Sequence, residues 1–287
     1  MKNKLVITLL VLSVIISSCK KETRDLKQVQ DQEIINFLGA SISNFTKDTS
    51  GIYYQILQQP TGDSLKNSDL IFYFQNINTV TGIPIANADK FNYTTNFLGY
   101  LSLPTVGPIG YYKTIMALSK RGGKIRSIIP SYLAFGKNGN GGLVKGNALI
   151  DATFEVFNAK NAIAAEDTII TRYKNTLNLD FIRDASGVYY NIISPGEGTP
   201  VTLISNISVN YTGKFFDGSQ FDASTVGSPL VSNLNVLIKG WQILTKIKKG
   251  GKVRILVPSH KAYGSSGRNT IPGNCPLDFE IEVVDVK

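Results

Sequence analysis

The sequence is poor in the side chains that supply covalent or metal chemistry in many enzymes. Its 287 residues include two cysteines, Cys19 and Cys275, and a single histidine, His260. A zinc site or a serine–histidine–aspartate triad therefore has few parts to draw on, and we expect no metal and no cofactor. Cys275 is expected to be a small buried residue rather than a nucleophile, and His260 to lie in a surface loop.

Charge is also sparse, and it is scattered. Charged residues make up 18% of the chain against 43% hydrophobic residues, and the formal net charge is +9. The dense basic runs, at residues 120–121 and 246–249, each precede a Gly-Gly pair. That position is typical of solvated turn or helix ends, so we expect no nucleic-acid partner. The composition is that of a globular protein, and the length suggests two domains.

One long apolar run, residues 5–16, follows Lys2 and Lys4 and precedes Ser17, Ser18 and Cys19. It is too short to span a bilayer and is typical of a bacterial export signal. Residues 16–19 resemble a lipobox. That resemblance implies cleavage of residues 1–18 and a diacylglyceryl thioether on Cys19; the alternative is an ordinary signal peptide with an incidental cysteine. If Cys19 is lipidated, Cys275 has no disulfide partner.

An internal repeat organises the rest of the chain. Four blocks occur twice in the same order, which predicts two copies of one domain. The matched blocks are residues 48–54 with 184–190, 122–131 with 250–259, 134–136 with 262–264, and 146–156 with 273–283. We place a tether at 19–30, the first domain at 31–158, a linker at 159–166 and the second domain at 167–287.

Each copy is predicted to be an α+β unit. Apolar residues recur at helical spacing at the start of each copy, and the second helix would open on the acidic pair Glu166-Asp167. Further on, residues 207–212 and 277–283 alternate in polarity, as in an antiparallel sheet with one buried face. A short helix is expected around Trp241 to Lys249, ended by Gly250. We therefore expect a curved antiparallel sheet wrapped on a short helix, with one leading helix in each domain. The leading stripes are Leu26, Val29, Ile34, Phe37, Leu38 and Ile42, and then Ile169, Ile170, Tyr173, Leu177 and Phe181.

Four motifs of the second copy, in their order and spacing, resemble the FKBP family of peptidyl-prolyl cis-trans isomerases. They are residues 209–213 (VNYTG), 217–224 (DGSQFDAS), 237–241 (LIKGW) and 258–264 (PSHKAYG), and Leu277, Phe279 and Ile281 close the series. The resemblance spans about residues 186–286.

The resemblance implies a proline pocket and assigns roles within it. Trp241 would be the floor under the substrate proline, Asp222 would orient and polarise the site, and Tyr263 would offer its hydroxyl to the substrate backbone. The Ile238 backbone N–H would donate to a substrate carbonyl. The implied lining residues are Tyr211, Phe221, Leu230, Leu237, Ile238, Ile271 and Phe279.

The second copy departs from the family pattern at the pocket rim. Leu230 stands where an aromatic residue is common, and the stretch from Pro229 to Trp241 is about two residues short. Arg268 lies near a position that is often histidine. These departures concern substrate preference and macrolide affinity more than the fold.

The first copy lacks much of the pocket set. We match Tyr73 with Tyr211, Tyr111 with Trp241, Phe135 with Tyr263, and Ile85-Ala86 with Phe221-Asp222. The first copy is therefore expected to be a degenerate FKBP-like domain that binds client polypeptides or serves as a spacer. Its glycine-rich run at 136–142 lacks the Lys-Ser/Thr ending of a phosphate loop.

The sequence and the resemblance together predict an isomerase and foldase for proline-containing exported polypeptides, active in the second domain only and held by lipid to a bacterial envelope membrane. Lys20 after Cys19 favours the outer membrane, with the domains facing the periplasm. The alternative is a non-catalytic chaperone or structural subunit of an outer-membrane complex. Similar lipoproteins in gliding bacteria are associated with motility and protein secretion.

Overall fold

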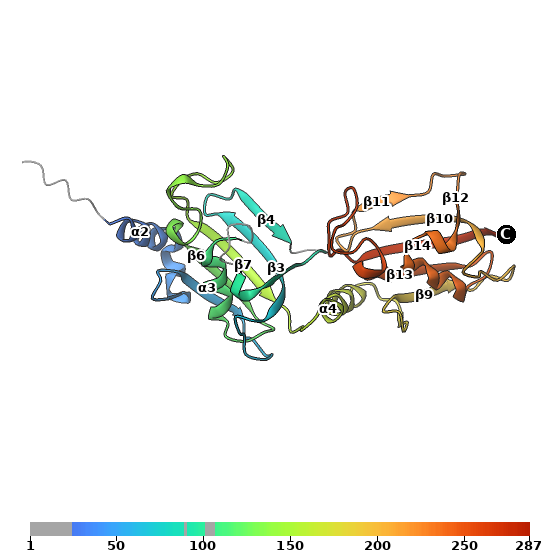
Figure 1. The fold of residues 1–287 in the computed structure, drawn as a ribbon, viewed down its shortest axis with the longest axis horizontal. Helices are drawn as coiled ribbons and strands as arrows, with labels where there is room; N and C mark the ends of the chain where they lie inside the picture. The colour runs from blue at the N-terminus through green and yellow to red at the C-terminus, as the bar shows by residue number, and fades with distance from the viewer. Residues whose placement is uncertain (1–24, 89–90, 101–106) are drawn as a thin grey trace, which may run out of the picture.

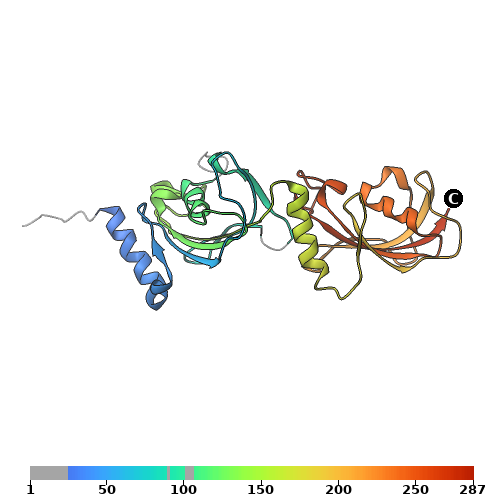
Figure 2. The same ribbon diagram turned by 90° about the horizontal axis from the view of Figure 1, so that it is seen from below.

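The computed structural model describes residues 25–88, 91–100 and 107–287. The predicted signal peptide and Cys19 lie outside these residues. Two domains follow one another along the long axis of the molecule, with the leading helix of the second domain between them (Figures 1 and 2). Within the part of the chain that the structure describes, no helix has the length and apolar character needed to span a bilayer.

The first domain is a seven-stranded antiparallel sheet with short helices. The strands lie in the order β1-β2-β6-β7-β3-β4, and β5 also pairs with β3. Its elements are α2 (Leu26–Leu38), η1 (Gly39–Asn44), β1 (Thr46–Lys47), β2 (Tyr53–Gln58), β3 (Leu70–Thr79), β4 (Pro84–Ala88), β5 (Thr94–Phe97), η2 (Leu98–Tyr100), α3 (Ile109–Ala117), β6 (Lys124–Ile129), η3 (Ser131–Leu133), η4 (Gly136–Asn138) and β7 (Ile150–Val156).

The second domain repeats this topology. Its sheet runs β8-β9-β13-β14-β10-β11, and β12 pairs with β10 as β5 pairs with β3. The predicted α+β class and the internal repeat are confirmed. Its elements are α4 (Ala162–Lys174), β8 (Ile182–Arg183), β9 (Tyr189–Ser194), β10 (Asn206–Lys214), β11 (Gln220–Ala223), β12 (Leu230–Asn233), η5 (Leu234–Val236), η6 (Lys239–Lys246), β13 (Lys252–Val257), η7 (Ser259–Lys261) and β14 (Leu277–Val286).

Strand β14 shows how the alternating pattern builds the core of the second domain. Phe279, Ile281 and Val283 are buried, whereas Glu280 and Glu282 between them are exposed. The buried side chains of the sheet pack with the buried face of η6, which bears Trp241. Sheet and helix therefore enclose one apolar core, as the alternation predicts.

The short helix differs from its prediction in type and length. It is a 3₁₀ helix from Lys239 to Lys246, whereas the sequence suggested a helix around Trp241 to Lys249. Ile247 has extended backbone and is buried, so the chain leaves the helix in order to place this apolar side chain in the core.

Each leading helix docks on its own sheet through one buried polar side chain. Gln30 of α2 accepts a hydrogen bond from the Ser131 backbone N–H at 2.9 Å, and Glu166 of α4 accepts one from the Ser259 N–H at 2.6 Å. Helix α2 begins at Leu26, inside the predicted tether at 19–30, so the ordered domain extends further toward the N-terminus. Two members of its predicted apolar stripe, Leu26 and Phe37, are exposed.

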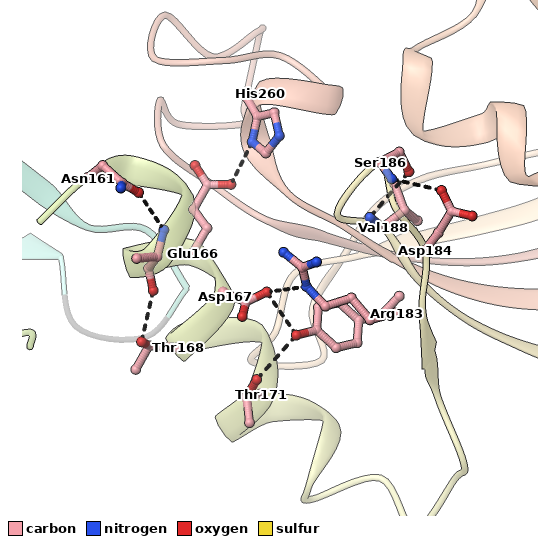
Figure 3. Close-up of polar contacts among 12 residues, drawn as sticks. Asn161, Glu166, Asp167, Thr168, Thr171, Arg183, Asp184, Ser186, Val188 and His260 are labelled. Atoms are coloured by element: carbon pink, nitrogen blue, oxygen red, sulfur yellow. Dashed lines mark hydrogen bonds and ion pairs between the residues drawn. The ribbon is translucent and has the colours of Figure 1, made fainter. Parts of the chain in front are cut away.

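Helix α4 begins before its predicted acidic start. The Asn161 side chain caps the helix by accepting from the Ala164 N–H at 2.9 Å, and the helix begins at Ala162, inside the predicted linker at 159–166. Glu166 therefore lies within the helix rather than at its N-terminus, and it points toward His260 at 3.7 Å (Figure 3). The next residue, Asp167, accepts instead from Arg183 Nε at 2.8 Å.

An apolar cluster joins the two domains. It contains Phe72, Tyr93 and Phe157 from the first domain and Ile170 and Phe216 from the second. Because one core includes side chains from both domains, the α4 connection is a packed joint and not an extended linker.

Candidate active site

A cavity of about 390 Å³ opens in the second domain between its sheet and η6. All ten side chains predicted for the pocket line it: Tyr211, Phe221, Asp222, Leu230, Leu237, Ile238, Trp241, Tyr263, Ile271 and Phe279. Val236, Arg268, Asn269 and Thr270 complete its lining. The last three belong to one tight turn, of which the sequence placed only Arg268 at the pocket rim.

The aromatic walls depend on a glycine in β10. Gly213 pairs with Phe279 of β14 on one side and with Asp222 of β11 on the other. A Cβ atom at Gly213 would lie 2.6 Å from the Phe221 ring and 2.9 Å from the Phe279 ring. The absent side chain therefore makes room for these rings to meet edge to face at 5.6 Å.

The floor of the cavity is the indole of Trp241. Its ring meets Phe279 edge-on at 5.5 Å and Tyr211 at 5.2 Å. Gly240 allows this position, because a Cβ atom there would lie 2.3 Å from Val257 in β13. Trp241 is buried, and its Nε1 atom has no hydrogen-bond partner among the described residues.

The polar groups of the cavity form a short chain. The Tyr211 hydroxyl donates to Asp222 Oδ2 at 2.7 Å, and the Ala223 N–H donates to Asp222 Oδ1 at 2.9 Å. Burial, followed by the hydrogen bond to Asp222, raises the pKa of Tyr211. Burial also raises the pKa of Tyr263, while Arg268 opposes that rise. Both hydroxyls are therefore protonated donors at neutral pH.

The rim offers further donors. The Ile238 N–H is hydrogen-bonded to no described residue, so it can donate to a bound chain. The guanidinium of Arg268 lies 5.7 Å from the centre of the Tyr263 ring. No group of three or more histidine, cysteine or acidic residues that could hold a metal occurs among the described residues.

Among the described residues, the same region of the first domain contains buried aromatic side chains. The pairing of β3 with β7 places Tyr73 opposite Val156, which corresponds to the pairing of Val209 with Val283. Our match of Tyr73 with Tyr211 is therefore wrong by two residues. Gln75 occupies the Tyr211 register, because it pairs with Phe154 as Tyr211 pairs with Ile281. Tyr73 points into the core with 2% of its surface exposed.

Two other matches in the first domain agree with the structure. Ala86 pairs with Ile77 as Asp222 pairs with Gly213, so the first domain has no carboxylate at this point. Gly110 packs directly against β6, as Gly240 packs against β13, since a Cβ atom at Gly110 would lie 2.4 Å from Ile129. Tyr111 thus takes the place of Trp241.

Residues 199–284 match the family model of the FKBP-type peptidyl-prolyl cis-trans isomerases. Over 105 residues the chain is 40% identical to the FKBP-type peptidyl-prolyl cis-trans isomerase FkpA of Escherichia coli. The aligned region covers 36% of this chain and 39% of that protein. Over 106 residues it is 38% identical to the peptidyl-prolyl cis-trans isomerase Mip of Coxiella burnetii. This aligned region covers 36% of this chain and 46% of that protein. The chain thus spans about two fifths of the length of these curated relatives.

A solved peptidyl-prolyl cis-trans isomerase from Pseudomonas syringae is also similar. It shares 33% identity with a TM-score of 0.40, over 44% of this chain and 93% of that one. Because the family model matches residues 199–284, the second domain is of the FKBP type.

Proposed function

We propose that the second domain catalyses cis–trans isomerisation of X-Pro bonds in exported polypeptides. The observation that carries this proposal is the cavity itself. It has an indole floor, aromatic walls and a few polar groups at its edge, and it lies within a domain of the FKBP type.

The reaction suits such a cavity because no bond is broken. The two isomers differ by roughly 0.5–1 kcal/mol but are separated by a barrier of ~18–20 kcal/mol, which arises from amide resonance. In the transition state the amide is twisted and its C–N unit is less polar. A site that excludes water and fits the twisted amide better than the planar one lowers the barrier.

The residues divide this task among them. The proline ring would rest on Trp241 between Tyr211 and Phe279, out of contact with water. The Ile238 N–H and the Tyr263 hydroxyl would hold the chain on either side of the twisting bond. Asp222 keeps the Tyr211 hydroxyl turned toward it and so fixes that wall of the cavity.

A proline-isomerisation assay on the fragment that starts at Lys20, which contains both domains, tests the proposal. We expect turnover of X-Pro peptides that a Trp241→Ala, Asp222→Ala double variant loses. Asp285→Ala is a matched control, since Asp285 pairs with Lys249 and does not line the cavity. Undiminished activity in the double variant would overturn the assigned site.

We further propose that Cys19 carries a lipid that holds the chain on the periplasmic side of the outer membrane. The support is the export-signal pattern of residues 1–19 together with Lys20. Cys19→Ser should move the protein from the membrane fraction to the soluble fraction. If the variant remained in the membrane fraction after a high-salt wash, the anchor would lie elsewhere.

A structural or chaperone subunit of an outer-membrane complex is the second candidate. The first domain, joined to the second by an apolar cluster, supports this role because it retains the fold while having Ala86 in place of the carboxylate and Tyr111 in place of the indole. Crosslinking in intact membranes followed by purification distinguishes the two candidates. Recovery of a purely monomeric protein would count against the complex.

A further inference from the structure

Arg268 differs in its pairing from the other arginines that the structure describes. Each of the other five forms an ion pair with a carboxylate, whereas Arg268 forms none with any described residue. The five pairs are Arg121–Asp69, Arg126–Asp151, Arg172–Glu155, Arg183–Asp167 and Arg254–Asp278. Arg268 is therefore a cation at the rim of the cavity that forms no ion pair with any described carboxylate.

The position of Arg268 is fixed at both ends of the residue. Its N–H donates to the Ile271 carbonyl at 2.9 Å, and the Ile271 N–H donates back to the Arg268 carbonyl at 2.8 Å. Asn269 closes this tight turn with a φ of 51°, and Ile271 is buried in the core. At the other end, the guanidinium lies over the Tyr263 ring. A cation held in this way loses less conformational freedom when it binds an anion.

The charges around the cavity favour one class of ligand. Asp222 and Arg268 are the charged residues that line it. Asp222 already accepts hydrogen bonds from the Tyr211 hydroxyl and the Ala223 N–H. Arg268 retains a planar set of N–H donors suited to a carboxylate. The equivalent turn of the first domain has Asn140 in this place, since Asn140 and Val144 form the same bridge as Arg268 and Ile271.

We propose that Arg268 selects substrates with an acidic side chain next to the proline. The inference rests on the proposed isomerase function, in which the proline ring occupies the floor of the cavity. The residue beside the proline would then lie at the rim, within reach of the guanidinium. A glutamate or aspartate there gains an ion pair, and a lysine is repelled.

Peptides that differ only in charge test this selection. The residue before or after the proline is set to Glu, Gln or Lys, and kcat/KM is measured for the full chain and for Arg268→Gln and Arg268→Glu variants. Because an ion pair at an exposed rim contributes ~0.2–1 kcal/mol, the wild type should favour Glu over Gln by up to about fivefold in one of the two series. Arg268→Gln should abolish this preference, and Arg268→Glu should reverse it in favour of Lys.

Lys248→Glu is the control for overall charge, since Lys248 is exposed and does not line the cavity. It should leave the Glu preference intact, and salt near 1 M should weaken the preference in the wild type. Equal Glu and Gln rates in the wild type would overturn the role of Arg268, and so would a Glu preference in Arg268→Gln as strong as that of the wild type. Either result would leave the proposed isomerase function intact. Failure to turn over any of the peptides would overturn both proposals.

Discussion

Tyr211 in the second domain and Gln75 in the first occupy the same register in the two equivalent sheets, yet Tyr211 is an aromatic wall of the cavity over Trp241 and Gln75 supplies no aromatic ring. The difference continues along the strand. The first domain has Ile77 where the second has Gly213, and Ala152 where the second has Phe279. The aromatic residues of the two domains are thus distributed differently over an equivalent backbone.

This difference in the placement of aromatic residues explains why the second domain has a cavity over Trp241. In the first domain, Tyr73 and Phe154 are buried and meet edge to face at 5.9 Å, and Tyr111 packs on Phe154 at 5.6 Å. In the second, the equivalents of Tyr73 and Phe154 are the smaller Val209 and Ile281. The second domain has small residues deep in its core and large ones at the opening of the cavity, which leaves room for a ligand. The first domain has large residues deep in its core, and these occupy the corresponding space.

The buried polar contact of the leading helix offers a second comparison. Gln30 in α2 and Glu166 in α4 each bind the serine that follows the Val/Ile-Pro strand end. Glu166 also accepts from the Tyr93 hydroxyl of the first domain at 3.0 Å. A carboxylate can accept more hydrogen bonds than an amide oxygen, so this position adds a contact between the domains to a contact within one.

The largest expected contrast is between Trp241→Ala and Tyr111→Ala. Removing the floor of the cavity should lower kcat/KM by about 100-fold, equivalent to ~3 kcal/mol of transition-state stabilisation. Tyr111→Ala should leave kcat/KM unchanged but should destabilise the first domain by about 3–5 kcal/mol, as expected for a buried aromatic residue. Peptide assays and denaturant unfolding measure the two effects. Loss of activity in Tyr111→Ala, with the second domain still folded, would contradict the division of roles.

Glu166→Ala should lower the free energy of unfolding by about 3 kcal/mol, because it leaves the buried Ser259 N–H without an acceptor and breaks the contact to Tyr93. Gln30→Ala should cost less, about 1–3 kcal/mol, since it affects one domain only. A double-mutant cycle of Glu166→Ala with Tyr93→Phe isolates the contact between domains. Strict additivity in that cycle would show that the Tyr93 hydrogen bond contributes nothing.

Asp184 should give the second domain a pH dependence in acid. The Ser186 backbone N–H and hydroxyl, with Lys246 at 3.1 Å, lower the pKa of Asp184 from 3.8 to about 2. The ionised carboxylate therefore stabilises the folded state at neutral pH, and this contribution disappears as the pH falls through about 2. Asp184→Asn should lower the melting temperature near neutral pH and match the wild type near pH 2. Lys246→Met should reduce the effect only slightly, because the hydrogen bonds from Ser186 lower the pKa of Asp184 more than Lys246 does.

The smallest expected effect is that of rebuilding the first domain. Tyr111→Trp with Phe135→Tyr, introduced into the Trp241→Ala background, should restore no isomerase activity. Tyr73 and Phe154 would still fill the cavity, and Ala86 supplies no carboxylate. The peptide assay measures the outcome, with the Trp241→Ala chain as the baseline. Any regained turnover would show that the missing side chains, and not the filled core, made this domain inactive.

Much of the architecture followed from local signals. Matched blocks predicted the repeat, alternating polarity predicted β14, and the motif residues predicted the ten side chains that meet at the cavity. The functional roles of those ten remain predictions until the variants are assayed. The errors arose where sequence similarity and spatial register diverge, since Tyr73 and Tyr211 are tyrosines in the equivalent strands β3 and β10 but differ by two positions in pairing.

The sequence by itself determined which residue types each strand and turn presents, because period-two alternation, glycine placement and turn residues are local properties of the chain. Tertiary structure alone decided the rest. Glu166 resembles a helix-start residue in the sequence, but its buried contact with Ser259 exists only once α4 has docked on its own sheet, and its contact with Tyr93 exists only once the two domains have packed together. Arg268 likewise became a rim cation without an ion pair to any described carboxylate only when the fold placed it on Tyr263. Both outcomes depend on distances between residues far apart in the chain, and a local pattern does not encode those distances.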